Sequence, residues 1–224
     1  MTLVKTLATH DIVQLVYPRP ITESDKLGIA VGKAIDGALS RYGYESGQDR
    51  RPTVSRMNKM AVEMLDNELM EADIELPPEE WEKLQNQLSG VLQAYRHSDI
   101  FGLPRPKTRM ILINKQVGIY AQPDYWDESA QIYEMKSYKA IPHPPDVDLQ
   151  LKIFQLAYPG FQTFLLCINR HATPVDTFCE KIAPLTDEEV KTTLQMVYQK
   201  GLEHGKDKVL EYVDNPIVTY SVSV

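Results

Sequence analysis

The sequence QVGIYAQPDYWDESAQIYEMK, residues 116–136, decides the expected fold class. Both of its ends are rich in β-branched and aromatic residues, and the polar residues 127–129 separate them. This pattern predicts two antiparallel strands joined by a short connection. Residues 109–113, Arg-Met-Ile-Leu-Ile, predict a strand directly before them, with a turn near Asn114 and Lys115. We therefore expect a meander of three sequential strands.

Three charged residues of this segment are expected to meet on one side of the meander. Side chains two residues apart on a strand point to the same face, so Glu134 and Lys136 share a side. A turn centred on Ser129 would place Asp124 directly opposite Glu134, with Cβ atoms about 4.5–5.5 Å apart. Two carboxylates this close repel each other unless a cation lies between them, and their oxygens suit Mg²⁺ or Mn²⁺. Lys136 adds a positive charge beside them.

These three side chains suit the hydrolysis of phosphodiesters. A metal ion acidifies and orients a water molecule and neutralises charge that grows on the phosphate oxygens. Lys136 could hold the nucleophile or stabilise the same charge. We predict Asp124, Glu134 and Lys136 as catalytic residues, with Asp124 and Glu134 as metal ligands. The alternative is a surface ion pair on a β-hairpin, because an Asp-x9-Glu-x-Lys spacing often arises by chance.

The rest of the chain predicts helices before the meander and a mixture of helices and strands after it. Helices are expected at residues 25–42, 54–72, 79–96 and 146–158, strands at 162–169 and 175–182, and a last helix from the capping box Thr186-x-x-Glu189. This order predicts an α/β or α+β fold. We expect a single domain over residues 1–224, with residues 1–100 mainly helical and residues 105–224 forming the catalytic sheet core.

The net charge of −7 conceals blocks of opposite sign. Residues 61–90 hold nine acidic side chains against the single Lys83, while residues 1–60 carry +3 and residues 91–120 carry +4. A basic surface that binds nucleic acid can therefore coexist with an acidic protein. Both blocks could equally be solvated faces without a partner.

Several classes of protein are disfavoured by composition and motifs. Cys167 and Cys179 are too few for a four-thiolate zinc or iron–sulfur site within one chain, and we expect them to be reduced, with a disulfide as the alternative. The chain lacks an apolar run of ~20 residues and a signal peptide, so we expect a cytoplasmic protein with no membrane contact. It also lacks the motifs of serine hydrolases, P-loop NTPases and dinucleotide enzymes.

Four segments of the chain resemble the PD-(D/E)xK nuclease superfamily and its RecB-like branch. Residues 118–124, Gly-Ile-Tyr-Ala-Gln-Pro-Asp, and 132–136, Ile-Tyr-Glu-Met-Lys, are similar to the catalytic hairpin of the superfamily. Residues 28–36, Gly-Ile-Ala-Val-Gly-Lys-Ala-Ile-Asp, resemble the upstream G-x-x-x-H helix of the RecB-like branch, with Asp36 where the family usually has His. Residues 150–154, Gln-Leu-Lys-Ile-Phe, resemble its Q-x-x-x-Y helix, with Phe in place of Tyr.

This resemblance implies a restriction-endonuclease-like core, a central mixed sheet flanked by helices, with a helical N-terminal elaboration. It implies an Mg²⁺- or Mn²⁺-dependent deoxyribonuclease of the type without an iron–sulfur cluster. Such an exonuclease would act on DNA ends or single strands, as in recombination, DNA repair or CRISPR adaptation, as a homo-oligomer or with a protein partner. The alternative is a catalytically weak or inactive nucleic-acid-binding subunit of a larger assembly.

Asp36 is predicted as a further ligand of the same metal ion. Gly28, Gly32 and Asp36 are spaced by four residues and so form one stripe on a helix. Glycines lack a Cβ atom and would let this helix pack closely on the sheet, which would bring Asp36 to the hairpin carboxylates. The alternative is an exposed Asp36 on the polar side of its helix.

Three residues after the meander are predicted to bind nucleic acid. The Q-x-x-x-Y resemblance implies a DNA contact for Gln150. Lys139 and Lys152 lie just past the expected site in sequence and could contact phosphates. A solvated lysine is the alternative for each of the two.

Overall fold

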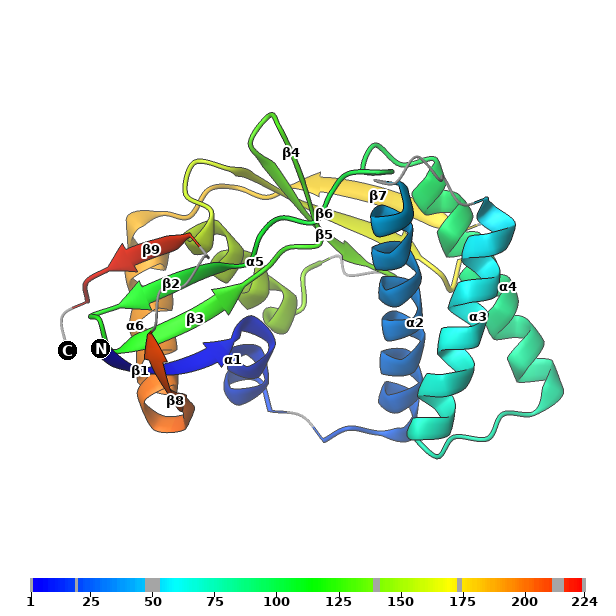
Figure 1. The fold of residues 1–224 in the computed structure, drawn as a ribbon, viewed down its shortest axis with the longest axis horizontal. Coiled ribbons are helices and arrows are strands. Elements are labelled where there is room, and N and C mark those ends of the chain that lie inside the picture. Colours follow the sequence, from blue (N-terminus) through cyan, green and yellow to red (C-terminus); the bar gives the residue numbers. More distant parts are fainter. Residues whose placement is uncertain are drawn as a thin grey trace.

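The computed structural model describes residues 2–18, 20–46, 53–138, 142–172, 175–210 and 216–222. Their helices and strands form a mixed α/β structure (Figure 1). In chain order the elements are β1 (Thr2–Ala8), α1 (Thr9–Val16), α2 (Glu23–Ser46), α3 (Val54–Glu71), α4 (Pro78–Arg96), β2 (Arg109–Ile113), β3 (Val117–Ala121), β4 (Tyr125–Asp127), β5 (Gln131–Lys136), α5 (Pro145–Ala157), β6 (Gln162–Asn169), β7 (Asp176–Lys181), α6 (Asp187–His204), β8 (Lys206–Leu210) and β9 (Ile217–Tyr220).

The strands form two mixed sheets instead of the one central sheet that was expected. Sheet A has the order β8-β1-β3-β2-β9, and sheet B has the order β4-β5-β6-β7. Parallel pairs occur in both, namely β1 with β3 and β2 with β9 in sheet A, and β5 with β6 in sheet B. The predicted α/β class is confirmed, while the division into two sheets corrects the expected arrangement.

The division occurs inside the segment that the sequence predicted as one strand. β3 ends at Ala121 in sheet A, and β4 begins at Tyr125 in sheet B. Pro123 between them has no N–H group to donate to a ladder, and the Gln122 side chain donates to the carbonyl of Pro106 at 2.9 Å. The chain therefore leaves one sheet and enters the other at Gln122 and Pro123, directly before Asp124.

The N-terminal strand and helix were not expected from the sequence. β1 lies inside sheet A, parallel to β3 on one side and antiparallel to β8 on the other. Helix α1 follows at once, and the Asp11 side chain accepts a hydrogen bond from the Ala8 N–H at its start. The described residues up to Ile100 thus contribute four helices and also one strand of the sheet core.

Helices α2, α3 and α4 form a layer against sheet B, as Figure 1 shows at the right of the molecule. Their positions agree with the predicted helices, with ends that differ by up to four residues. The apolar spacing of each helix becomes one core, which also receives Tyr125 of β4 and Tyr133 of β5. The hairpin that carries the predicted site is therefore anchored on this core.

A second core lies between sheet A and helices α1, α5 and α6. Helix α6 begins at the predicted capping box, where the Thr186 hydroxyl accepts from the Glu189 N–H at 3.3 Å. Its Gly201 packs so closely on β3 that an added Cβ would overlap the Val117 side chain. Among the described helices, none has both the length and the apolar character needed to cross a membrane.

Candidate active site

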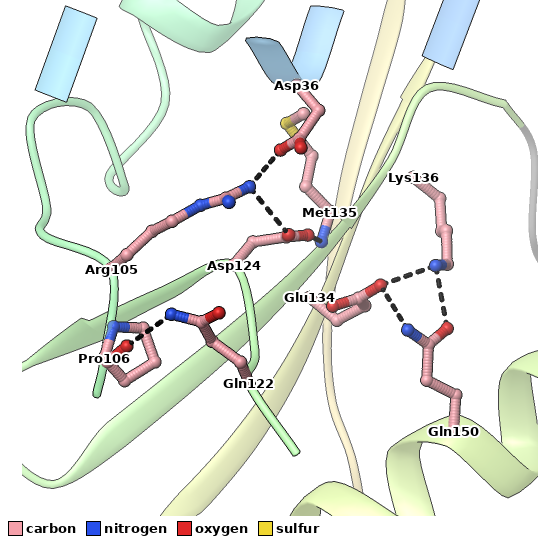
Figure 2. A network of polar contacts seen from close by, with 9 residues as sticks. All are labelled: Asp36, Arg105, Pro106, Gln122, Asp124, Glu134, Met135, Lys136 and Gln150. Atoms are coloured by element: carbon pink, nitrogen blue, oxygen red, sulfur yellow. Dashed lines mark hydrogen bonds and ion pairs between the residues drawn. The ribbon is translucent and has the colours of Figure 1, made fainter. Parts of the chain in front are cut away.

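Asp124, Glu134 and Lys136 lie together on the β4–β5 hairpin (Figure 2). Tyr125 pairs with Tyr133 in the ladder, and the Asp124 N–H donates to the Tyr133 carbonyl at 3.1 Å. Continuing this register by one residue sets Asp124 opposite Glu134. Hairpins keep a fixed register because a slip by one residue would turn every side chain to the other face.

Glu134, Lys136 and Gln150 form a closed triangle of hydrogen bonds. Lys136 Nζ lies 2.5 Å from Glu134 Oε1 and 2.9 Å from Gln150 Oε1, and Gln150 Nε2 donates to Glu134 Oε1 at 2.9 Å. The Glu134 side chain is only 5% exposed. Its Oε2 atom has no hydrogen-bond partner among the described residues. Gln150 of α5 thus orients the hairpin carboxylate and the lysine, while its predicted contact with DNA stays a prediction.

Lys136 keeps its proton in this surrounding. Burial by itself lowers the pKa of a lysine, but the carboxylates of Glu134 and Asp124 more than offset it, so that the pKa of Lys136 is raised above its ordinary value. The side chain therefore acts as an ammonium group, able to stabilise negative charge and unable to accept a proton.

One carboxylate oxygen of Asp124 accepts a hydrogen bond, while the other has only a more distant cation nearby. Its Oδ2 atom accepts the Met135 N–H at 2.8 Å, and its Oδ1 atom lies 3.7 Å from Nη2 of Arg105. Burial and repulsion by Glu134 raise the pKa of Asp124 to about 7, against the opposite effects of Lys136, the Met135 N–H and Arg105. The neighbouring cations thus leave part of the negative charge uncompensated.

Asp36 faces the hairpin from helix α2, through Arg105. The Arg105 guanidinium contacts Oδ1 of Asp36 and lies between this carboxylate and Asp124 (Figure 2). Desolvation raises the pKa of Asp36, Arg105 lowers it and Asp124 raises it again, with a net upward effect. The Asp36 side chain therefore points toward Arg105 and the site while 53% of it stays exposed, and an arginine occupies the place expected for a metal.

The glycine stripe of α2 does not pack on the sheet, which corrects the expected reason for its two glycines. A Cβ atom added to Gly32 would meet nothing within 4 Å, and one added to Gly28 would lie 3.6 Å from Nη2 of Arg170. Both glycines line a cavity of about 570 Å³ together with Asp36, Asp124, Glu134 and Lys136. The close approach of a helix to a sheet occurs instead at Gly201.

Two further cavities adjoin this central cavity. One, of about 750 Å³, lies toward α1 and shares Asp25, Ile29 and Asp146 with it. The other, of about 500 Å³, lies toward α4 and shares Arg170 and His171. The candidate site therefore lies in the middle of three adjoining cavities.

Lys152 takes part in ion pairs outside the cluster, and its predicted contact with phosphates stays a prediction. Its Nζ atom binds Asp148 at 3.0 Å and Glu189 at 3.3 Å, which ties α5 to the start of α6. Residues two apart on a helix do not share a face, so the helix that aims Gln150 at the site turns Lys152 elsewhere. Lys139 lies outside the described residues.

The donor set fits a hard divalent cation. Asp124 Oδ1 and Glu134 Oε2 each belong to a carboxylate whose other oxygen is fixed by N–H donors. Among the described residues, no cluster of three or more His, Cys, Asp or Glu side chains could hold an ion. Mg²⁺ commonly uses one or two carboxylates and completes its shell with water and substrate phosphates. Asp36 could join only if Arg105 moved.

Two arginines near the carboxylates were not singled out from the sequence. Arg105 belongs to the basic residues 91–120, and nothing in the neighbouring sequence predicted its position between two aspartates. Arg170 directly follows β6, beside the end of the parallel strand β5. Side chains that follow neighbouring parallel strands meet at one edge of a sheet, and this signal could have paired Arg170 with Lys136.

Comparisons with known proteins give only distant structural similarity. The sequence matches no protein-family model and no curated protein. A crystal structure of a "Putative exonuclease" from Eubacterium rectale is similar at 12% identity and a TM-score of 0.44, over 90% of this chain and 77% of that one. A crystal structure of a protein named SSO0001 is similar at 11% identity and a TM-score of 0.39, over 92% and 79% of the two chains. Similarities of this size establish neither a family nor a function.

Proposed function

We propose that this chain is a metal-dependent nuclease with Asp124, Glu134 and Lys136 as its catalytic residues. One observation carries the proposal. Two adjacent carboxylates each keep one oxygen without a tight partner, beside a permanently charged lysine, at the wall of a cavity. This arrangement can hold a cation and a phosphate next to each other.

The reaction that fits this arrangement is hydrolysis of a phosphodiester. Water adds to phosphorus, one ester P–O bond breaks, and the proton of the water ends on the leaving oxygen, so that a phosphate monoester and an alcohol form. An Mg²⁺ or Mn²⁺ ion held by Asp124 and Glu134 would supply acidified water and positive charge. Lys136 stabilises the negative charge that grows on the phosphate oxygens, and Gln150 keeps Lys136 and Glu134 in place.

We further propose DNA as the substrate, cleaved at ends or as a single strand in the manner of RecB-like exonucleases. Three adjoining cavities favour an extended ligand such as a DNA strand over a compact one. Cytoplasmic location and a partner from a repair, recombination or CRISPR complex remain predictions, as does a homo-oligomer.

A second candidate function is that of a non-catalytic nucleic-acid-binding subunit. It is favoured by the contact of Arg105 with Asp36, because a guanidinium between Asp36 and Asp124 offsets part of the negative charge that an active nuclease would offer to its metal. In this case the site would bind phosphate without cleaving it.

Incubation with labelled DNA and RNA oligonucleotides separates the two candidates. The panel contains single-stranded, blunt and tailed substrates, each with Mg²⁺, with Mn²⁺ and with a chelator. A nuclease gives products with Mg²⁺ or Mn²⁺ that disappear with the chelator and in Glu134→Gln. Binding of the same oligonucleotides with no product under any condition would establish the non-catalytic role.

A further inference from the structure

A tight turn after β6 places Arg170 at the end of sheet B where strands β5 and β6 have their carboxyl ends. The carbonyl of Asn169 accepts the Ala172 N–H at 3.1 Å, and its side-chain oxygen accepts the His171 N–H at 3.2 Å. β5 and β6 are parallel, so Arg170 lies beyond the same strand ends as Ser137. The turn thus aims a guanidinium at the segment that follows Lys136.

Only part of the Arg170 guanidinium is used within the described structure. Its Nη1 atom donates to Ser137, to the hydroxyl at 2.8 Å and to the carbonyl at 3.3 Å. Its Nε atom is buried without a hydrogen-bond partner, and its Nη2 atom lies over Gly28, where α2 has no side chain. Nη1 is therefore anchored on Ser137, whereas Nη2 lies beside Gly28 without a hydrogen-bond partner among the described residues.

Arg170 also lacks a carboxylate partner among the described residues. Burial lowers the pKa of Arg170, and the Tyr138 side chain, not a carboxylate, acts on it in the opposite direction. An arginine so placed keeps its charge, because its ordinary pKa is far above neutral. A buried cation without a counterion is costly and gains from an anionic ligand.

The charges around the central cavity make Arg170 the side chain best placed to bind an anionic ligand there. Five carboxylates line the cavity, those of Asp25, Asp36, Asp124, Glu134 and Asp146. The lysine and arginine on its wall are Lys136 and Arg170, and Lys136 already binds Glu134. A phosphate that enters at a distance from the metal site is repelled by these acids and attracted by Arg170.

We propose that Arg170 binds a non-scissile phosphate of the substrate strand through Nη2, the guanidinium nitrogen that Ser137 leaves unused. This rests on the proposed nuclease function and adds a second contact point, on the Ser137 side of Lys136. Arg170 and His171 line both the central cavity and the cavity toward α4. The strand then passes Gly28 and continues toward α4, and Arg170 fixes the phosphate next in line to the one that is cleaved.

The proposal is tested by binding of a fluorescent single-stranded oligonucleotide in the presence of a chelator, which prevents cleavage. Arg170→Gln should weaken binding about 10–100-fold, the worth of a charge-assisted hydrogen bond. The salt dependence, as the slope of log K against log salt, should shrink by about 0.7. Lys200→Gln removes one positive charge from α6, which lines none of the three cavities, and should change neither quantity.

A second pair of variants covers the case that Arg170→Gln does not fold. Gly28→Asp places a carboxylate beside Nη2 of Arg170 and leaves the Ser137 contacts intact, whereas Gly28→Ala adds only a methyl group at ordinary contact distance. Gly28→Asp should weaken oligonucleotide binding at least 10-fold relative to Gly28→Ala. Melting temperatures of both variants verify that each is folded.

The outcomes distinguish failure of this inference from failure of the proposed function. If wild type cleaves oligonucleotides but the Arg170 and Gly28 variants bind like their controls, the Arg170 site is wrong and the nuclease stands. If wild type cleaves nothing but binding depends on Arg170, the strand contact stands and the nuclease is wrong. Competition by inorganic phosphate or a mononucleotide as strong as that by the oligonucleotide would overturn a strand site.

Discussion

In each of the two hairpin carboxylates, one oxygen accepts hydrogen bonds and the other has no close partner. Asp124 gives Oδ2 to a backbone N–H and Glu134 gives Oε1 to Lys136 and Gln150, so that neither side chain can turn freely. Held side chains lose little conformational entropy when they bind an ion or a phosphate. The same fixation makes single substitutions informative, because the neighbours keep their places.

Lys136→Ala should lower the rate of oligonucleotide cleavage roughly 100–1000-fold, the usual loss when a group that stabilises transition-state charge is removed. Glu134 keeps its bond to Gln150, so the protein should still fold and still bind metal. Lys33→Ala on α2 also removes a lysine from an ion pair, with Glu68, and should leave the rate unchanged. Unchanged cleavage in Lys136→Ala would refute the role of the lysine, and an unfolded variant would mark its ion pair as structural.

Asp124 should make both stability and metal binding depend on pH. The pKa of Asp124 is about 7 in the folded protein and about 4 in an unfolded chain. Between about pH 4 and about pH 7 the folded protein therefore holds one more proton than the unfolded chain. The free energy of unfolding of the metal-free protein should therefore fall as pH rises through this window, by up to about 1.4 kcal/mol per pH unit. Mg²⁺ competes with this proton, so the rise in melting temperature that Mg²⁺ causes should grow toward about pH 7 and then level off.

Asp124→Asn is the matched variant for this pH dependence, since an amide keeps the shape and cannot ionise. Melting curves from about pH 5 to about pH 8, with and without Mg²⁺, should show a flatter profile and little metal effect in the variant. A metal-induced shift that is equal in wild type and Asp124→Asn would place the cation elsewhere, for instance along the acidic residues 61–90.

Arg105 and Asp36 should show whether the arginine competes with metal or helps to hold it. If Arg105 occupies a ligand position, Arg105→Ala should increase the melting shift caused by Mn²⁺, and Asp36→Ala should then cancel this gain in the double variant. Asp36→His should retain activity with Mn²⁺ better than with Mg²⁺, because imidazole prefers the softer ion. An Asp36→Ala variant with unaltered metal binding in both backgrounds would limit Asp36 to its pair with Arg105.

Among the elements, helix α2 combines a core-facing side with a side that lines the central cavity. Ala30, Ala34 and Ala38 are buried against α3 and α4, while Gly28 and Gly32 border open space. Glycine inside a helix costs up to ~1 kcal/mol relative to alanine, and no packing contact at Gly32 offsets this cost. Under the proposed function, these glycines would leave room for a substrate strand in the cavity.

Gly32→Ala should raise the free energy of unfolding by about 0.5–1 kcal/mol and weaken oligonucleotide binding or cleavage. Gly37→Ala on the same helix is the control, since its new Cβ would lie 2.6 Å from Sδ of Met64 and force that side chain to move. Urea denaturation should thus rank Gly32→Ala above Gly37→Ala in stability. A stabilised Gly32→Ala with full activity would show that the substrate does not pass this face.

Elements with a strong local pattern could be predicted from the sequence. Helices α3 and α4 and strand β6 follow from apolar spacing within one segment, and α6 from its capping box. The register of the β4–β5 hairpin followed from its short connection, which brought Asp124 and Glu134 together. These are properties of neighbours in sequence, which single-sequence patterns report well.

Features that depend on distant partners could not be predicted. β8, with the sequence KDKVL, looks like a solvated segment and becomes a strand because β1 offers it a ladder. Charged residues are frequent on such edge strands, which disguises them. The place of Arg105 between Asp36 and Asp124 likewise joins a helix, a loop and a hairpin, and no spacing in the sequence encodes it.

The described part of the molecule contains two large hydrophobic cores, and strand β5 contributes to both. One joins sheet B to α2, α3 and α4, and the other joins sheet A to α1, α5 and α6. Ile132 of β5 and several residues of α5 belong to the second core, although β5 lies in sheet B. We expect this overlap to make the two cores unfold as one unit.

The two tryptophans can test this expectation, since Trp81 contacts the first core and Trp126 the second. Trp81→Phe and Trp126→Phe each leave one fluorescent reporter. Urea unfolding curves of the two variants should have the same midpoint, and the same midpoint by circular dichroism, as a two-state transition requires. Separate midpoints would instead divide the chain into two domains, with the hairpin at their boundary.

The pairing of β1 with β8 has a consequence for the synthesis of the protein. The Thr6 hydroxyl donates to the carbonyl of Lys206, which follows it by 200 residues. At about 5–20 residues per second, a ribosome needs about 10–40 s to cover this interval. During that time the edge of β1 that pairs with β8 has no partner, and exposed strand edges readily pair with other chains. Slow translation would therefore lengthen the period in which this edge of β1 is open to pairing with other chains, and the emergence of β8 ends it.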